Sequence, residues 1–241
     1  MLKLLQRLRF WRPRTVCCNI CGWEAPQYLD WHGDFGHVYP RAVCGGCEAH
    51  PRHRTLHLYL QQKLARTKPL KLLHFAPEPT LQKLFQSYEN IHYLSVDLDP
   101  GRAMQSEDIT RLTFADNEFD IILCVHVLEH IVDDARAMAE LFRVLKPGGF
   151  AIIDVPIDWK RETTHEDPAI TSPEARTKAF WQSDHVRLYG RDFGEKLGRA
   201  GFTVLADRFV RSLGRWRIAR HGLKKAPLYF CTKPAATAPG K

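Results

Sequence analysis

No apolar run in the 241-residue chain approaches the roughly 18 residues that a bilayer-spanning helix needs. The opening stretch, residues 1–14, is also interrupted by Arg and Lys, which is unlike the apolar centre of a secretion signal. We therefore expect a cytoplasmic protein without a transmembrane segment. For residues 1–14 we favour a frayed basic terminus, with a short amphipathic helix in weak peripheral contact with an anionic membrane as the alternative.

The chain also lacks the scattered cysteines of a disulfide framework. It contains seven cysteines, and four of them form two Cys-x-x-Cys pairs. Paired cysteines of this kind favour metal binding in a reducing compartment. At 44% hydrophobic residues, the chain can bury one full core and a small appendage. The net charge of +8 favours an anionic partner but does not indicate a fold.

The two cysteine pairs predict a structural zinc site. Cys18 and Cys21 form the first pair, and Cys44 and Cys47 form the second. Four thiolates close a tetrahedral zinc site and leave no open position for catalysis. We expect a zinc-ribbon-like module over residues 15–66. Cys17 is a neighbour or a spare ligand, and the alternative ligands are the nearby histidines His50, His53 and His57.

Residues 53–64 have the apolar periodicity of a helix, which would connect the ribbon to the main domain. Arg52, His53 and Arg54 lie at the start of this stretch. They predict a solvated helix face, and contact with an anion is the alternative.

A strand–helix–strand unit dominates the middle of the chain. Residues 119–125 and 150–155 are short apolar runs typical of buried strands. Between them, residues 133–145 have helical spacing, with Asp133 as the N-cap and Lys146-Pro147-Gly148-Gly149 ending the helix. Such a unit indicates a parallel sheet.

The residues of this unit resemble the class I S-adenosylmethionine-dependent methyltransferases of the type 11-like group, which includes the ubiquinone-type O-methyltransferases. The resemblance rests on FDIILCVHVLEH followed by LFRVLKPGGFAIIDVP, and it extends over roughly residues 70–232. It implies an α/β fold with a doubly wound, mostly parallel, seven-stranded Rossmann-like sheet. The methyltransferase domain would then occupy residues 67–234.

The first strand of such a domain usually ends in a glycine-rich turn, and here that turn has no glycine. The sequence reads HFAPE, which resembles a variant in bacterial proteins with a four-cysteine N-terminal segment. Ala76 is small enough for close approach of the cofactor, and Glu78 could receive its ammonium group. The resemblance implies S-adenosylmethionine contacts from these residues: His74, Phe75, Ala76, Glu78, Asp97, Leu98, Asp108, Ile109, Cys124, Val125 and His126.

Two acidic positions carry most of the expected nucleotide binding. Asp97 follows the strand at residues 91–96 and could accept hydrogen bonds from both ribose hydroxyls, with Asp99 as the fallback. By resemblance, Asp108 would accept from the adenine amino group, and Ile109 would pack on the ring.

Glu129, His130 and His185 are the candidate catalytic residues. Ubiquinone-type relatives have Glu-x-x-Glu-His at this point, which can hold a divalent cation, but His126 replaces the first Glu here and disfavours Mg²⁺. We favour the interpretation that Glu129 and His130 satisfy backbone groups at a helix start. His185 lies in a long polar insertion that predicts a substrate lid. With an unperturbed pKa of about 6.5, it is the candidate general base, oriented by Asp184 or Glu166.

The predicted function is methyl transfer to oxygen on an anionic small molecule or glycan precursor. Arg187 and Tyr189 could clamp such an acceptor. An RNA base methyltransferase is the alternative, because a zinc module before such a core also resembles the ribosomal RNA guanine methyltransferases and the net charge of +8 fits a polyanion. The basic residues 208–225 predict a solvated hairpin, and together with Trp216 they could instead bind phosphate or lipid head groups. The chain lacks the Asn/Asp-Pro-Pro-Tyr motif of enzymes that methylate amino nitrogens. A non-catalytic scaffold that senses S-adenosylmethionine is the third interpretation.

Overall fold

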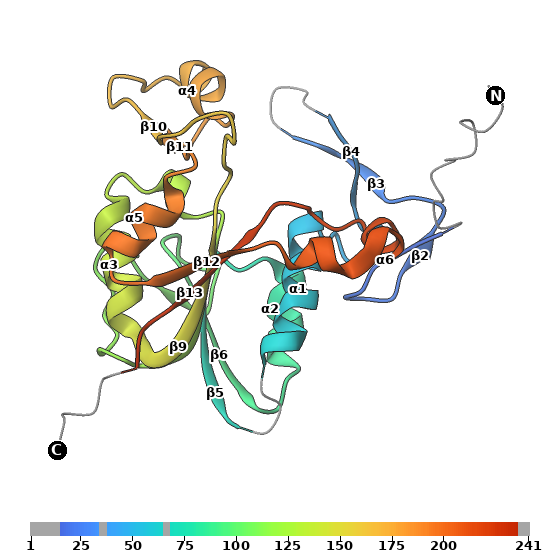
Figure 1. Ribbon diagram of the computed structural model, residues 1–241, viewed down its shortest axis with the longest axis horizontal. Helices are drawn as coiled ribbons and strands as arrows, with labels where there is room; N and C mark the ends of the chain where they lie inside the picture. Colours follow the sequence, from blue (N-terminus) through green and yellow to red (C-terminus); the bar gives the residue numbers. More distant parts are fainter. Residues whose placement is uncertain (1–14, 34–37, 65–67, 236–241) are drawn as a thin grey trace, which may run out of the picture. The chain divides into compact units, whose positions relative to one another are not determined.

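The structure is a computed structural model that describes residues 15–33, 38–64 and 68–235. It divides into two compact units: Met1–Leu64 with Arg208–Pro227 form unit 1, and Ala65–Asp207 with Leu228–Lys241 form unit 2 (Figure 1). The predictions for residues 1–14 and for the last residues of the chain lie outside the described residues. No helix in the described part of the chain is both long and apolar enough to span a bilayer.

Unit 1 contains two small antiparallel ribbons and three helices. Strand β1 (Val16–Cys17) pairs with β2 (Glu24–Ala25), and β3 (Leu29–His32) pairs with β4 (Val38–Val43). The helices are α1 (Pro51–Lys63), the 3₁₀ helix η3 (Phe209–Leu213) and α6 (Gly214–His221). Strands this short bury little apolar surface, so a unit of this size needs an additional source of stability.

Helix α1 forms as predicted, but its basic start is not a solvated face. Pro51 occupies the first turn, where its missing N–H costs nothing. Every residue from position 53 to position 60 is buried. Arg54 is fully buried and His53 is 4% exposed, so the solvated-face prediction was wrong for both. The periodicity of the sequence indicates burial of only one apolar stripe. In the structure this helix is buried on several sides, so its polar residues are buried as well.

The basic segment after residue 207 also differs from its prediction. In place of a solvated hairpin, it forms η3 and α6 and belongs to unit 1, whereas the predicted domain boundaries leave it in the methyltransferase domain. Val210 and Leu223 pack against Leu58 of α1. Gly222 ends α6 with φ +54°, and a Cβ at this position would lie 2.6 Å from the ring of Tyr28.

Unit 2 is built on one seven-stranded sheet in the order β12-β13-β9-β8-β5-β6-β7. Its strands are β5 (Leu70–Phe75), β6 (Ile91–Asp97), β7 (Gln105–Ser106), β8 (Phe119–Val125), β9 (Leu145–Asp154), β12 (Thr203–Asp207) and β13 (Leu228–Thr232). Only β13 runs antiparallel to its two neighbours. The predicted mostly parallel, seven-stranded Rossmann-like sheet is confirmed.

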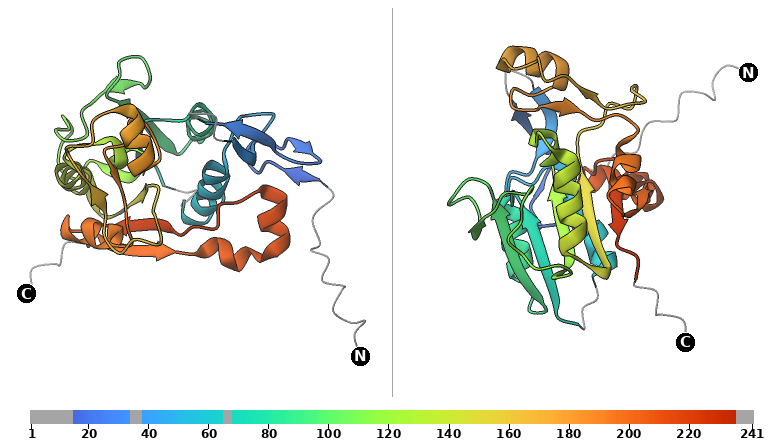
Figure 2. Two further views of the ribbon diagram at one scale, coloured as in Figure 1. Left: turned by 90° about the horizontal axis from the view of Figure 1, so that it is seen from above. Right: turned by 90° about the vertical axis from the view of Figure 1, so that its left-hand side faces the viewer.

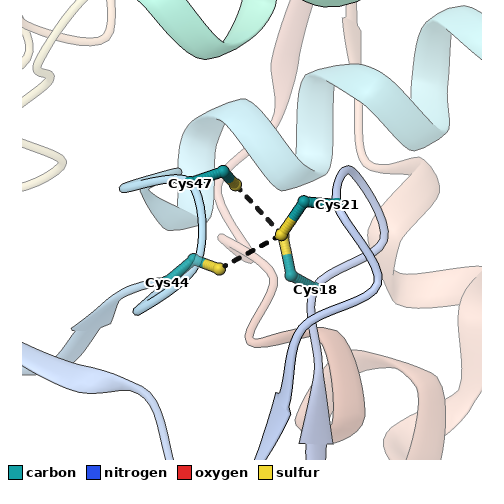
Figure 3. A group of neighbouring side chains, drawn as sticks. All are labelled: Cys18, Cys21, Cys44 and Cys47. Atoms are coloured by element: carbon teal, nitrogen blue, oxygen red, sulfur yellow. Dashed lines mark hydrogen bonds between the residues drawn. The ribbon is translucent and has the colours of Figure 1, made fainter.

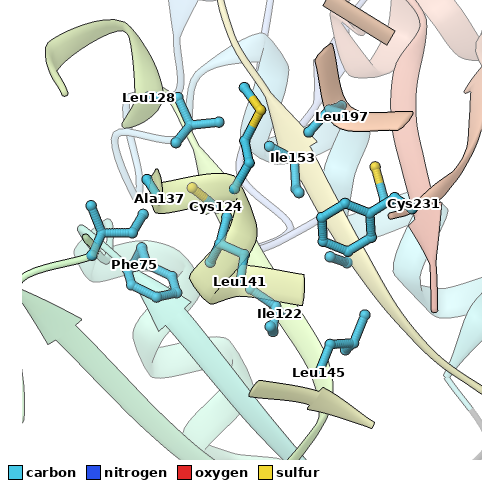
Figure 4. Packing of buried hydrophobic residues seen from close by; sticks show 14 of the residues in the cluster. Phe75, Ile122, Cys124, Leu128, Ala137, Leu141, Leu145, Ile153, Leu197 and Cys231 are labelled. Atoms are coloured by element: carbon cyan, nitrogen blue, oxygen red, sulfur yellow. The ribbon is translucent and has the colours of Figure 1, made fainter. Parts of the chain in front are cut away.

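Alternating side chains of β5 show that helices cover both faces of this sheet. Leu73 and Phe75 point into the main core together with α3 (Asp134–Val144) and α5 (Phe193–Arg199) (Figure 4). The intervening His74 points to the other face, where its ring contacts Phe85 of α2 (Pro79–Gln86). This alternation follows from the two-residue period of a strand and makes the fold doubly wound.

The boundary between α3 and β9 is tighter than predicted. Asp133 is the N-cap of α3, as expected, and its carboxylate accepts from the backbone N–H of Arg136 at 2.9 Å. Strand β9 begins at Leu145, directly after the helix, so the Lys-Pro-Gly-Gly stretch belongs to an irregular strand start. Gly148 adopts φ +77° there.

The polar insertion lies beyond the carboxyl ends of β8 and β9 (Figures 1 and 2). It contains β10 (His165–Glu166), α4 (Pro173–Phe180) and β11 (Arg187–Leu188), and β10 and β11 pair antiparallel. The insertion therefore stands at the sheet edge where doubly wound folds hold ligands.

Candidate functional site

The sheet of unit 2 has its switch point between β5 and β8. From β5 the chain continues to β6 and β7 on one side, and it then returns to β8 on the other side. Ligands of doubly wound folds bind in the crevice at the carboxyl ends of the strands at such a point. Ala76 follows β5 and His126 follows β8, so both lie at this edge.

Both residues adopt the left-handed conformation, with φ +45° for Ala76 and +57° for His126. Their backbone N–H groups extend the sheet by one bond each: Ala76 donates to Val96 at 2.9 Å, and His126 donates to Asp154 at 2.8 Å. A left-handed backbone favours glycine and costs other residues about 1–2 kcal/mol. The glycine-free turn thus has a glycine-like backbone with an exposed alanine, which leaves room for a ligand beside it.

His74 and Glu78 lie behind this turn. His74 is fully buried, and its Nδ1 lies 3.0 Å from the hydroxyl of Tyr93. Its Nε2 lies 3.4 Å from a carboxylate oxygen of Glu78, which is 18% exposed. The ring of His74 packs inside unit 2, so of these two side chains only Glu78 is accessible to a ligand.

Asp97 ends β6 at the ligand edge. One carboxylate oxygen accepts the backbone N–H of Asp99 at 2.9 Å, which orients the side chain and leaves the second oxygen for a ligand. The next residue, Leu98, is 69% exposed. An oriented, half-buried carboxylate next to an exposed apolar side chain suits a ribose and its attached base.

Asp108 and Ile109 are neighbours with different surroundings: one is hydrogen-bonded within its loop, and the other is buried in the core. The carboxylate of Asp108 accepts from the backbone N–H and the hydroxyl of Thr110, and these bonds lower its pKa. Ile109 is 5% exposed and packs into the main core. Its side chain therefore supports the loop from below and offers a ligand little surface.

Three other predicted cofactor contacts belong to the core. Phe75, Cys124 and Val125 are 4%, 0% and 6% exposed (Figure 4). Burial raises the pKa of the Cys124 thiol well above its usual range. At the strand ends these residues present their backbone, and not their side chains, to the ligand edge.

Glu129, His130 and His185 come together at the same edge. Glu129 and His130 belong to the short helix η2 (Leu128–His130) after β8, and His185 comes from the insertion. The rings of His130 and His185 are edge to face, with centres 4.8 Å apart. Each of the three side chains offers a possible ligand atom within 4.8 Å of the other two. Burial raises the pKa of Glu129 to about 7 and lowers that of His185.

The surroundings of these side chains correct two predictions. Among the described residues, neither carboxylate oxygen of Glu129 has a hydrogen-bond partner, so this side chain does not satisfy backbone groups at the helix start. Asp184 pairs with Nδ1 of His130 at 3.3 Å and does not orient the ring of His185 through a hydrogen bond as expected. The Nδ1 of His185 instead lies 2.9 Å from the carbonyl oxygen of Phe180.

Arg187 and Tyr189 hold the insertion in place and do not face a ligand. Arg187 is 4% exposed; it donates to the carbonyls of Leu128 and Ile131 and pairs with Glu166 at 2.9 Å. Tyr189 is fully buried, and its hydroxyl donates to Asp134 at 2.7 Å. The predicted anion clamp was therefore wrong, and Glu166 is committed to Arg187. Sequence alone gave no sign that these residues join the insertion to η2.

The four paired cysteines of unit 1 form a second cluster (Figure 3). Sulfur–sulfur distances are 3.7 Å between Cys18 and Cys47 and 3.6 Å between Cys21 and Cys44. The cluster contains no histidine among the described residues, and Cys17 lies outside it. The predicted alternative ligands are thus not part of the group: His57, for example, lies 3.2 Å from the side-chain nitrogen of Asn19 and 3.0 Å from that of Gln61.

The two cysteine turns have the same hydrogen-bond pattern. Cys18 donates to the carbonyl of Trp23 and accepts from Gly22, and Cys44 donates to Ala49 and accepts from Glu48 at corresponding positions. The residue four places after each first cysteine has a positive φ, +77° for Gly22 and +58° for Glu48. Two equivalent turns therefore present two sulfur atoms each to a common centre.

The chemistry of this sulfur group fits zinc. Burial raises the pKa of Cys18 to about 11 and also raises that of Cys47, so these two thiols stay protonated unless a cation stabilises their thiolates. Four converging soft sulfur ligands favour a tetrahedral zinc ion. Arg54 is fully buried near the four cysteines. Its guanidinium group needs no further partner, because its nitrogens donate to four backbone carbonyls. Sequence analysis assigned Arg54 to a solvated helix face and missed its buried role, for which the sequence carries no signal.

Comparisons with known proteins agree with the fold of unit 2. Residues 80–153 match the family model Methyltransf_11, described as a methyltransferase domain. The chain is 33% identical over 64 residues to the "Probable S-adenosylmethionine-dependent methyltransferase" of Mycolicibacterium smegmatis, which covers 27% of this chain and 23% of that protein. It is 43% identical over 47 residues to the demethylmenaquinone methyltransferase of Bacteroides fragilis, covering 20% and 19%.

These matches span only part of the relatives. An uncharacterized methyltransferase of Mycolicibacterium gilvum is 31% identical over 80 residues, which is 31% of its length. The crystal structure of the cyclase SpnF has a TM-score of 0.56 at 15% identity, covering 88% of this chain and 89% of that one. That likeness shows the fold alone. Residues 80–153 are thus similar to a methyltransferase domain, and the relatives that match part of the chain include proteins named as methyltransferases.

Proposed function

We propose that the protein transfers the methyl group of S-adenosylmethionine to an oxygen of an anionic small molecule or glycan precursor. The observation that carries the proposal is the group Glu129, His130 and His185, which stands at the same sheet edge as Ala76 and Asp97. A cofactor edge and a cluster of proton-accepting side chains are the two parts that such a transfer needs.

The cofactor supplies a methyl group that its sulfonium already activates. When bound, it would give this methyl group to the acceptor oxygen in exchange for the carbon–sulfur bond, with S-adenosylhomocysteine and the hydroxyl proton as the other products. In this chain, Asp97 would hold the ribose, and the turn at Ala76 would let the cofactor approach the backbone. We assign removal of the proton to the Glu129–His130–His185 group.

For unit 1 we propose a structural zinc ion bound by Cys18, Cys21, Cys44 and Cys47. The matched hydrogen bonds of the two cysteine turns support it. All four positions of a tetrahedral ion are taken by sulfur, so the ion would stabilise unit 1 and take no part in methyl transfer.

Calorimetric titration of S-adenosylhomocysteine into metal-analysed full-length protein tests the proposed function. We expect binding that Asp97→Ala abolishes and Asp99→Ala largely preserves, because Asp99 contributes a backbone N–H to Asp97 and keeps it in the variant. Absence of binding by folded wild-type protein would overturn the enzyme proposal and favour a non-catalytic scaffold.

An RNA base methyltransferase is a second candidate, and one observation favours it. Helix α6 exposes Arg215, Trp216 and Arg217 side by side, and a basic helix with an exposed aromatic ring suits a polyanion with stacked bases. Retention of the protein on immobilised RNA at increasing salt concentration distinguishes the two. If Arg215→Ala/Arg217→Ala leaves the salt dependence unchanged, this candidate loses its support.

A further inference from the structure

The group Glu129, His130 and His185 is assembled from two distant parts of the chain. The backbone N–H of Val186 donates to the carbonyl of Glu129 at 2.9 Å, and this bond places His185 beside η2. Arg187 reinforces the junction through the carbonyls of Leu128 and Ile131. Hydrogen bonds between the insertion and the backbone at η2 therefore hold the three side chains together.

Glu129 is the unusual member of the group. Its side chain is 1% exposed, and within the described residues neither carboxylate oxygen has a hydrogen-bond partner. A buried polar group without a partner costs about 1–3 kcal/mol, and a carboxylate costs more. The nearest basic atom is Nδ1 of His126, at 3.2 Å from one oxygen. A buried carboxylate of this kind is stabilised when a cation binds next to it.

Both histidines are oriented as metal ligands usually are. The Nδ1 of His185 lies 2.9 Å from the carbonyl oxygen of Phe180, so Nδ1 carries the proton and Nε2 carries the lone pair. The Nδ1 of His130 lies 3.3 Å from the carboxylate of Asp184, which favours the same tautomer. Histidines that bind metals commonly donate their second ring N–H to a carbonyl or a carboxylate in this way.

The donor set indicates which ions fit. Two imidazoles and one carboxylate suit zinc and the neighbouring first-row transition metals, whereas Mg²⁺ and Ca²⁺ prefer oxygen ligands alone. Metal–ligand bonds of about 2.1 Å separate tetrahedral ligands by roughly 3.4 Å, so side-chain shifts on the order of 1 Å would close the group. With three protein ligands, at least one coordination position stays open.

We propose that Glu129, His130 and His185 bind a divalent transition-metal ion, and that its open position takes an oxygen of the methyl acceptor. The second part rests on the proposed function; with the ion bound, the ligand atoms of the three side chains are occupied, and the proton of the acceptor hydroxyl passes to solvent and not to them. A cation at this point would lower the pKa of an acceptor hydroxyl and favour acceptors that chelate through two neighbouring oxygens. The ring of His130 is 30% exposed, whereas Glu129 and His185 are buried, so an acceptor would reach the group from the side of His130.

The test counts metal ions in the full-length protein. We expect two equivalents of zinc per chain after equilibration with zinc and gel filtration, one at the cysteines and one at this group. Glu129→Gln and His130→Gln should each lose one equivalent, and Cys44→Ser should lose the other. His165→Gln changes an insertion histidine outside the group and should keep both. His130→Gln changes a partly exposed side chain, so we expect this variant to fold more reliably than those with changes at the buried positions.

Cobalt absorption separates the two sites. Cobalt at the cysteines gives intense sulfur-to-metal bands, and cobalt at an oxygen–nitrogen site gives only weak visible bands. The weak bands should vanish in His130→Gln while the intense bands remain. One equivalent in the wild type, unaffected by Glu129→Gln, would overturn the metal proposal. S-adenosylhomocysteine titration of the same samples reports on the proposed function independently, so either proposal can fail while the other stands.

Discussion

The guanidinium group of Arg54 lies over the ring of Tyr28, with 3.8 Å between its carbon and the ring centre. Tyr28 in turn donates its hydroxyl to the carbonyl of Cys17 at 2.8 Å. The pair links the middle of unit 1 to the residue that precedes the first cysteine turn. A buried cation stacked on an aromatic ring is stabilised by the ring face and by the carbonyls around it.

Arg54→Met should strongly destabilise the protein. It would leave four backbone carbonyls, those of Ala42, Ala49, His221 and Gly222, without their donors. We expect a loss of about 3 kcal/mol or more in the free energy of unfolding, measured by urea titration. Lys63→Met removes an exposed charge from the same helix and should change this free energy by less than about 0.5 kcal/mol. Equal effects of both changes would contradict the role given to Arg54.

Replacing one cysteine of the cluster should remove one zinc ion and loosen unit 1. Cys44→Ser takes away a buried sulfur ligand, whereas Cys17→Ser changes a cysteine that lies outside the cluster. Metal analysis and circular dichroism should show one equivalent lost and reduced structure only for Cys44→Ser. Retention of all zinc by Cys44→Ser would refute the four-sulfur site.

Ala76→Gly should stabilise the protein, although glycine usually destabilises. Ala76 has φ +45°, and relief of this left-handed conformation should gain about 0.5–1 kcal/mol after the entropic cost of glycine. Ala206→Gly, an exposed position in β12, should lower stability by a similar amount. Thermal unfolding of both variants checks the opposite signs.

Glu140 should make stability depend on pH. Its carboxylate accepts from Arg143 at 2.8 Å and from the backbone N–H of Leu112 at 2.9 Å, and the hydrogen bond from Arg143 is the main cause of its lowered pKa. A lowered folded-state pKa means that the contribution is complete above the unfolded-state pKa of about 4.5 and is lost as pH falls through the folded value.

Glu140→Gln should therefore cost about 1–3 kcal/mol at pH 7, and the difference from wild type should shrink below pH 4.5. Urea titrations at pH 7, 5 and 4 measure it. Glu174→Gln, at an exposed position in α4, provides the matched control. A difference for Glu140→Gln that does not change with pH would show that its charge is not what stabilises the fold.

Local patterns predicted single strands and one helix of unit 2, whereas its seven-stranded sheet was predicted from the resemblance to a family. The apolar runs of β6 and β8 lie within one residue of their predicted ends, and Asp133 caps α3 as expected. These features depend on the spacing of apolar side chains and on helix capping, and both involve residues that are close together in the sequence. The four cysteines were also predictable, because each pair needs only a tight turn.

Contacts between distant segments were not predictable in this way. The burial of Arg54 depends on carbonyls 167 and 168 residues away, at the end of α6. The roles of Asp184 and Glu166 were wrong because both residues were assigned to His185, while the pairing of β10 with β11 takes Glu166 to Arg187. Spacing along the chain could not show that the carboxylate of Glu129 would be buried with only His126 close to it.

Unit 1 is discontinuous in the chain, and this has a consequence for biosynthesis. The first 64 residues leave the ribosome with both cysteine turns complete, yet two of the acceptors for Arg54, the carbonyls of His221 and Gly222, are made more than 150 residues later. Arg54 therefore lacks two of its four acceptors while all but the last strand of the sheet of unit 2 is synthesised. Unit 1 can therefore be completed only after the chain has been synthesised as far as residue 222.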